Sequence, residues 1–141
     1  MAGSSMNDQT RESVVQWLAK ARNDWTAVEI LLASGHAPAE TVCFHCQQYV
    51  EKLLKAVLTY DGVEAPRTHD LRRLIQLAMS CVPELSSFVD PADGLTVYGV
   101  QTRYPGDWQQ VGPDDMDKAV HLARQFGALL IPRVEQWTKS L

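Results

Sequence analysis

The sequence has 141 residues, and its fractions of hydrophobic residues (45%) and charged residues (21%) are typical of one soluble globular domain. With 13 basic and 17 acidic residues the formal net charge is −4, which disfavours a general nucleic-acid binder, because such proteins usually carry a basic excess. No apolar run approaches the roughly 18 residues of a membrane-spanning helix, so we expect no association with a membrane.

The chain begins with the polar stretch "MAGSSMNDQTRES", which lacks the apolar core of a secretory signal. We expect residues 1–10 to form a disordered lead-in, with Met6 as an alternative start, and residues 11–141 to form a single helical domain. The three cysteines are an odd number in a chain without a secretion signal, which favours free thiols and a cytoplasmic location.

Two long helices are predicted in the first part of this domain. The first carries apolar residues at three- and four-residue spacing and ends at Gly35, because a left-handed helix end favours a residue without Cβ. The second follows Pro38 and continues to about Tyr60, where Asp-Gly ends it. The apolar stripe of the first helix consists of Val14, Leu18, Ala21, Trp25, Val28 and Leu32.

Two shorter helices are predicted next. Thr68 is a suitable N-cap for the third helix, with Asp70 in its first turn, where the helix dipole favours an acid. A further helix is expected at Asp90, with Pro91 at its first position, although Gly94 weakens it. The shared face of the third helix consists of Leu71, Leu74, Ile75, Ala78, Cys81 and Val82.

The last predicted helix opens at "GPDDMDKAV", which places a proline and three acids at a helix N-terminus. Pro132 is expected to kink it, because proline removes a backbone hydrogen bond and crowds the carbonyl of Ala128. Its stripe consists of Met116, Ala119, Val120, Ala123, Gly127, Leu130, Val134 and Trp137. Nothing indicates a strand, so the predicted fold class is all-α, an up-and-down antiparallel bundle of four to five helices.

The stretch "CFHCQQYVEKLLKAVL" contains a Cys-x-x-Cys motif, which in other settings binds a metal or catalyses redox chemistry. At about 100° per residue, Cys43 and Cys46 continue the leucine–valine stripe of the second helix. This side of the helix consists of Cys43, Cys46, Gln47, Val50, Leu53, Leu54, Val57 and Leu58. No second Cys/His pair is available to complete a zinc site, and no strand precedes the motif as in a redox site. We therefore expect both thiols to be buried, reduced and without metal.

The opposite side of this helix is polar, with His45, Gln48, Lys52 and Lys55, and Glu51 alongside. We expect Lys55 to lie on a solvated face that carries helical charge pairs. A functional role for the others requires a second surface that converges on them.

Four segments, in order and spacing, resemble the prokaryotic HEPN domain family. They are "ARNDWTAVEILLASG", "CFHCQQYVEKLLKAVLTYDG", "RTHDLRRLI" and "TRYPG", and the likeness extends from about Val14 to Trp137. The resemblance implies an all-helical bundle that commonly dimerises and is associated with nucleotides or RNA. Many members are encoded beside minimal nucleotidyltransferases as toxin–antitoxin pairs, and others are ribonucleases.

The nuclease branch of the family carries an arginine and a histidine separated by four to six residues. Histidine transfers protons near neutral pH, and arginine stabilises the charge of the phosphate transition state. In this sequence no arginine is followed by a histidine at that spacing, and Arg67 and His69 in "RTHD" stand too close together. We therefore expect no catalytic residue of this kind, no metal and no cofactor.

The candidate nucleotide-binding residues are those of the "THD" and "RYP" segments together with one lysine. They are Lys52, His69, Asp70, Arg103 and Tyr104. If the third helix packs beside the "RYPG" turn, Arg103 and Lys52 would meet an anion at the N-terminus of that helix. The alternatives are that Asp70 only caps its helix and that Arg103 only pairs with Glu51 or Asp70.

Three functions follow from these observations. The leading one is a non-catalytic protein that binds a nucleotide or RNA, or that docks to a nucleotidyltransferase-type partner. The second is a ribonuclease with a non-standard site, such as His69 with Arg103 of either subunit, and the third is a purely structural homodimer. Val15, Ile30 and Phe44 lie off the buried stripes, which favours a homodimer in each case.

Overall fold

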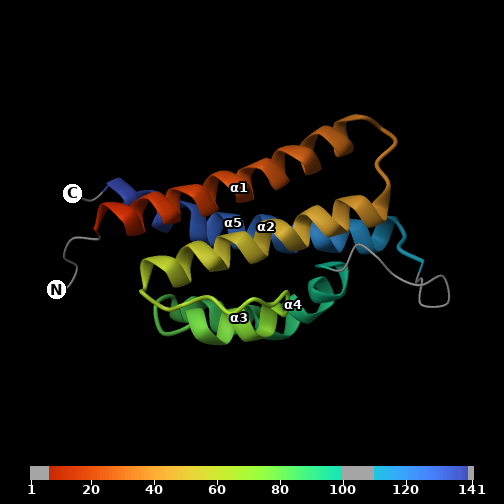
Figure 1. Ribbon diagram of the computed structural model, residues 1–141. Helices are drawn as coiled ribbons and strands as arrows, with labels where there is room; N and C mark the ends of the chain where they lie inside the picture. The colour runs from red at the N-terminus through yellow and green to blue at the C-terminus, as the bar shows by residue number, and fades with distance from the viewer. Residues whose placement is uncertain (1–6, 100–109, 140–141) are drawn as a thin grey trace.

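The computed structural model describes residues 7–99 and 110–139, which form helices and short connections without a strand (Figure 1). The α-helices are α1 (Asp8–Ala33), α2 (Ala39–Tyr60), α3 (Leu71–Ala78), α4 (Val89–Thr96) and α5 (Pro113–Lys139). Two short 3-10 helices, η1 (Pro83–Phe88) and η2 (Val97–Gly99), flank α4. The all-α helical bundle predicted from the sequence is confirmed.

Helix α2 lies at the centre of the bundle. It contacts α1 on one side, α3 and α4 on the other, and α5 along its back, whereas α1 makes no contact with α3 or α4 (Figure 1). Tyr60 and Trp137, near the C-terminal ends of α2 and α5, stack with ring centroids 4.0 Å apart. Helices α2 and α5 therefore run in the same direction, and α1 runs antiparallel to both.

The core is built from the apolar stripes that the sequence predicts. In α2 every residue assigned to the cysteine side of the helix is buried, including both thiols. In α1, α3 and α5 the predicted stripes are also buried, except for a few members at the edges, such as Trp25, Leu32 and Cys81, that are partly exposed. Phe126 of α5 is a large buried side chain that the predicted stripe omits, and its ring lies 4.6 Å from that of Phe88.

Helix α1 begins earlier than the predicted domain boundary at residue 11. Asn7 caps it, because its side-chain oxygen accepts a hydrogen bond of 2.7 Å from the backbone N–H of Thr10. Residues 8–10, predicted as part of the lead-in, are therefore helical. At the other end Gly35 adopts φ +76°, the left-handed conformation that the sequence predicts there.

The start of α3 differs from the prediction by two residues. Asp70, not Thr68, is the N-cap, and its carboxylate accepts a hydrogen bond from the backbone N–H of Arg72. Thr68 lies in the preceding turn, where its hydroxyl accepts a hydrogen bond from the backbone N–H of Asp70. Two residues with capping side chains stand here, separated by one residue, and sequence alone does not decide which of them begins the helix.

The region of η1 and α4 also differs from the prediction. Helix α4 begins at Val89, so Asp90 lies in its first turn and is not its N-cap. The 3-10 helix η1, which begins at Pro83, was not predicted, because its six residues are too few to show a clear apolar period. Helix α5 begins at Pro113 as predicted, and its helical assignment continues across Pro132.

Candidate functional site

Three of the five predicted site residues lie in the described part of the chain. Lys52 lies on α2, and His69 and Asp70 precede α3. Arg103 and Tyr104 lie outside the described residues, so their predicted place beside α3 stays a prediction. Asp70 caps α3, which agrees with the alternative prediction that this residue is a helix cap.

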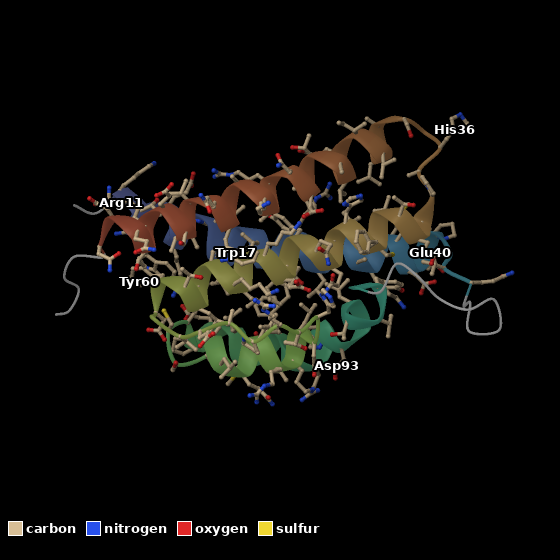
Figure 2. All side chains as sticks on the ribbon, in the orientation of Figure 1. Arg11, Trp17, His36, Glu40, Tyr60 and Asp93 are labelled. Atoms are coloured by element: carbon tan, nitrogen blue, oxygen red, sulfur yellow. The ribbon has the colours of Figure 1, made fainter. Side chains whose placement is uncertain are left out.

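Lys52 is bound to a carboxylate of the neighbouring helix. Its Nζ donates to Oδ2 of Asp24 on α1 at 2.5 Å, and Nδ1 of His45 lies 2.8 Å from Oδ1 of the same carboxylate. The Asp24 side chain is 9% exposed, so two nitrogen groups of α2 hold a largely buried acid of α1. Figure 2 shows the side chains of these two helices meeting in the space between them.

His69 is bound to a second buried carboxylate, on the α3 side of α2. Its Nδ1 lies 2.8 Å from Oε1 of Glu51, which also accepts a hydrogen bond of 3.0 Å from the side-chain amide of Gln47. The other carboxylate oxygen of Glu51 accepts a hydrogen bond of 2.9 Å from Nζ of Lys55. Glu51 itself is only 4% exposed, and its three partners satisfy both of its oxygens.

The ionisation of Glu51 is decided by competition between burial and these donors. Burial alone would raise its pKa, since it penalises the charged form. Hydrogen bonds from Lys55, Gln47 and His69 outweigh this effect and leave the pKa of Glu51 below its ordinary value of 4.5. Glu51 is therefore an ionised structural acid at neutral pH and is unsuited to accept a proton as a general base.

Gln47 joins this cluster to the segment that follows α4. Its amide also donates to the backbone carbonyl of His69 at 3.3 Å and accepts a hydrogen bond from the amide of Gln48 at 2.7 Å. Gly99, the last residue of η2, packs directly on it, because a Cβ at that position would lie 3.0 Å from the Gln47 amide. The fully buried Gln47 thus fixes the connection before α3 and the end of η2 against α2.

The polar side of α2 is therefore not a solvated face, which corrects the sequence-based expectation. Lys55 is only 13% exposed, pairs with Glu51 and lies over the ring of Trp17, whose centroid is 5.4 Å away. Neither Asp24 nor the structural role of Gln47 was predicted from the sequence. Asp24 follows Ala21 by three residues and precedes Val28 by four, which places it on the buried stripe of α1. This spacing was visible in the sequence and could have predicted a buried acid.

These contacts limit what the predicted residues can do chemically. Lys52 has its charge neutralised by Asp24, and its side chain is 22% exposed. His69 keeps 59% of its side chain exposed, so a ligand reaches it more easily than Lys52. Lys52 and His69 serve two different carboxylates on two sides of α2, and the described residues do not bring them together into one phosphate-sized site.

Both cysteines of the Cys-x-x-Cys motif are buried and free, as predicted. Burial is the largest cause that raises the pKa of Cys43 to about 11 and that of Cys46 to about 12. Neither thiol therefore forms a reactive thiolate at neutral pH. In the ranges 7–99 and 110–139, no three His, Cys, Asp or Glu side chains are grouped as metal ligands.

The described helices do not include one with the length and apolarity needed to cross a bilayer. A search of curated proteins gave no significant match. Among solved structures, the crystal structure of an archaeal HEPN homologue superposes with a TM-score of 0.64 at 23% identity. The match covers 86% of this chain and 97% of that one, so the two share a fold. The family model of the HEPN domain matches residues 14–133, which include all five α-helices in whole or in large part, and the chain therefore belongs to the HEPN family.

Proposed function

We propose that this HEPN protein is a non-catalytic binding module, which takes a nucleotide or RNA or docks to a nucleotidyltransferase-type partner in a toxin–antitoxin-like pair. The observation that carries the proposal is the spacing of arginines and histidines, none of which matches the nuclease branch. His69, the histidine nearest to an arginine in the sequence, is held at Nδ1 by the buried carboxylate of Glu51. Its nearest arginine, Arg67, precedes it by two residues, which is shorter than the spacing of the nuclease branch.

The surface for such a ligand would lie at the exposed edge of His69, beside the N-terminus of α3. Backbone N–H groups at a helix N-terminus favour an anion. One of these groups, the N–H of Arg72, already donates a hydrogen bond to the carboxylate of Asp70. Arg73, exposed in the first turn of α3, adds a positive charge to this edge. A nucleotide phosphate would therefore contact His69 and Arg73 from outside, without displacing the Lys52–Asp24 pair.

Calorimetric titration with ATP, AMP and a short single-stranded RNA tests this proposal. We expect one of these ligands to bind, and the affinity to fall about tenfold in His69→Ala, as for the loss of one charge-assisted hydrogen bond. The matched control is His36→Ala, because His36 is an exposed histidine at the distant turn between α1 and α2 (Figure 2). Equal affinities in wild type and His69→Ala would contradict the assignment of this edge.

A homodimer is proposed as the working form of the protein. Val15 of α1 is 46% exposed and Ile30 of the same helix is 64% exposed, whereas Phe44 is partly buried. Large apolar side chains on a surface favour association, although single ones are common on monomers. Light scattering at micromolar concentration is expected to give twice the mass of the chain, and a monomer mass would reject this proposal.

A further inference from the structure

A groove with a volume of about 400 Å³ lies between α4 and α5, away from the Asp24 and Glu51 clusters. Its lining includes the apolar side chains of Leu95, Ala119 and Leu122, and Gly94 lies at its edge. Grooves of roughly 300–1,000 Å³ with mainly apolar walls and a few polar groups are typical of small-molecule sites. The size and the walls of this groove therefore suit an apolar body of small-molecule dimensions.

The polar groups of the groove stand together on α5. Lys118, His121 and Gln125 follow one another at intervals of three and four residues, so they lie on one face of the helix, and all three line the groove. None of them makes a hydrogen bond or an ion pair with any residue in the part of the chain that the structure describes. An ammonium, an imidazole and an amide thus stand along one wall of an apolar groove, exposed to solvent and without a partner among the described residues.

The neighbouring charged side chains, in contrast, have partners within the described part of the chain. On the other face of α4, the guanidinium of Arg72 is bonded to Asp90 at 2.6 Å and to Asp93 at 2.6 Å, so that cluster is complete without a ligand. The acid of the groove, Asp115, already accepts a hydrogen bond of 2.9 Å from the backbone N–H of Gly112. Lys118 is therefore a cation at an apolar wall for which no carboxylate of the described chain serves as a partner.

We propose that the α4–α5 groove binds a small organic acid. Its apolar body, aromatic or branched, would lie against Leu95 and Leu122, and its single carboxylate would accept hydrogen bonds from Lys118 and the Gln125 amide. The charge of Lys118 selects an anion, and the apolar walls select against inorganic phosphate, which has no body to bury. This site is separate from the His69 edge, and it holds whether or not a nucleotide binds there.

The test uses 2-naphthoate as the probe, its neutral analogue 2-naphthamide, and the amide NMR signals of the isotope-labelled full chain. We expect saturable shifts confined to residues 91–98 and 115–125, and binding about tenfold weaker for the amide, since a charge-assisted hydrogen bond is lost. Lys118→Gln should remove most of the preference for the acid. Lys20→Gln, which changes an exposed lysine of α1, should leave the preference unchanged.

A second pair of variants tests the apolar walls. Gly94 has no atom within 4 Å of the place of a Cβ, so Gly94→Leu introduces a side chain at the groove without a clash at its first carbon. It is expected to weaken naphthoate binding at least tenfold, whereas Gly94→Ala, the matched control, should bind nearly as well as wild type. Shifts elsewhere on the molecule, no saturation at millimolar probe, or equal affinity in Gly94→Leu would each overturn the proposal.

Discussion

Removal of the Glu51 carboxylate is the perturbation that most sharply tests the polar cluster on α2. In Glu51→Ala the Gln47 amide loses an acceptor at 3.0 Å in a fully buried position, which costs about 1–3 kcal/mol of unfolding free energy. Lys55 loses its ion pair while only 13% exposed, but its ammonium can turn toward water, so we expect about 1 kcal/mol more. His69, at 59% exposed, can be hydrated and adds little.

The expected total for Glu51→Ala is therefore about 2–4 kcal/mol, measured by urea denaturation at pH 7. Glu51→Gln keeps an oxygen acceptor and should cost about half as much, since it loses the charge but not the shape. The matched control is Glu12→Ala, which removes an exposed glutamate of α1 and should change stability by less than about 0.5 kcal/mol. An unfolding free energy for Glu51→Ala no lower than that for Glu12→Ala would show that the cluster does not stabilise the fold.

The pH dependence of the same variants has a defined sign. Because the folded-state pKa of Glu51 lies below 4.5, its ionised form stabilises the fold fully at higher pH. This contribution falls as the pH drops below 4.5 toward the folded-state pKa. The stability difference between wild type and Glu51→Gln should therefore be constant near neutral pH and shrink in acid, and a difference that grows in acid would contradict the direction of the shift.

Three further outcomes are expected. Asp24→Ala leaves His45 and Lys52 without their shared acid, so it should lower the unfolding free energy by about 2–3 kcal/mol in the same urea assay. The control is Asn23→Ala at the exposed neighbour, which should leave the unfolding free energy nearly unchanged. In Gly127→Ala the added Cβ would overlap the hydroxyl of Tyr49. The unfolding free energy should therefore fall by about 1–3 kcal/mol, although alanine has the better helix propensity. A smaller loss in a Tyr49→Phe background would identify the hydroxyl as the cause. Cys43 and Cys46 have pKa values of about 11 and 12, so they should react with a thiol reagent at pH 8 only as fast as the protein unfolds. Rapid reaction of either thiol in the folded protein would show that it is not buried in the core.

The fold was largely predictable because its helices bury continuous stripes. In α2 the eight predicted residues recur with the helical period over the whole element, and a local pattern of this length fixes both the helix and its buried face. The end of α1 at Gly35 was equally predictable, since it depends only on the left-handed backbone conformation that glycine adopts readily. The start of α3 and the helix η1 were not, because two capping residues only two positions apart, and a short segment, leave several boundaries with nearly equal free energy.

The candidate site was predictable only in part, for a different physical reason. His69, Lys52 and Asp70 were found by their chemical type, but their roles depend on partners distant in the sequence. The contact between Lys52 and Asp24 joins two helices, and the contact between His69 and Glu51 joins a loop to a helix. No local period encodes such pairings, so a row of charges on α2 gave the same pattern as a solvated surface.

Incubation of the pure protein with a labelled single-stranded RNA, followed by measurement of cleavage, tests whether this HEPN module lacks the nuclease chemistry. The predicted result is no cleavage above the protein-free background, at any pH between 6 and 8, and no difference between wild type and His69→Ala. RNA cleavage that is lost in His69→Ala but retained in His36→Ala would contradict the claim, because it would show that the histidine bound to Glu51 takes part in catalysis.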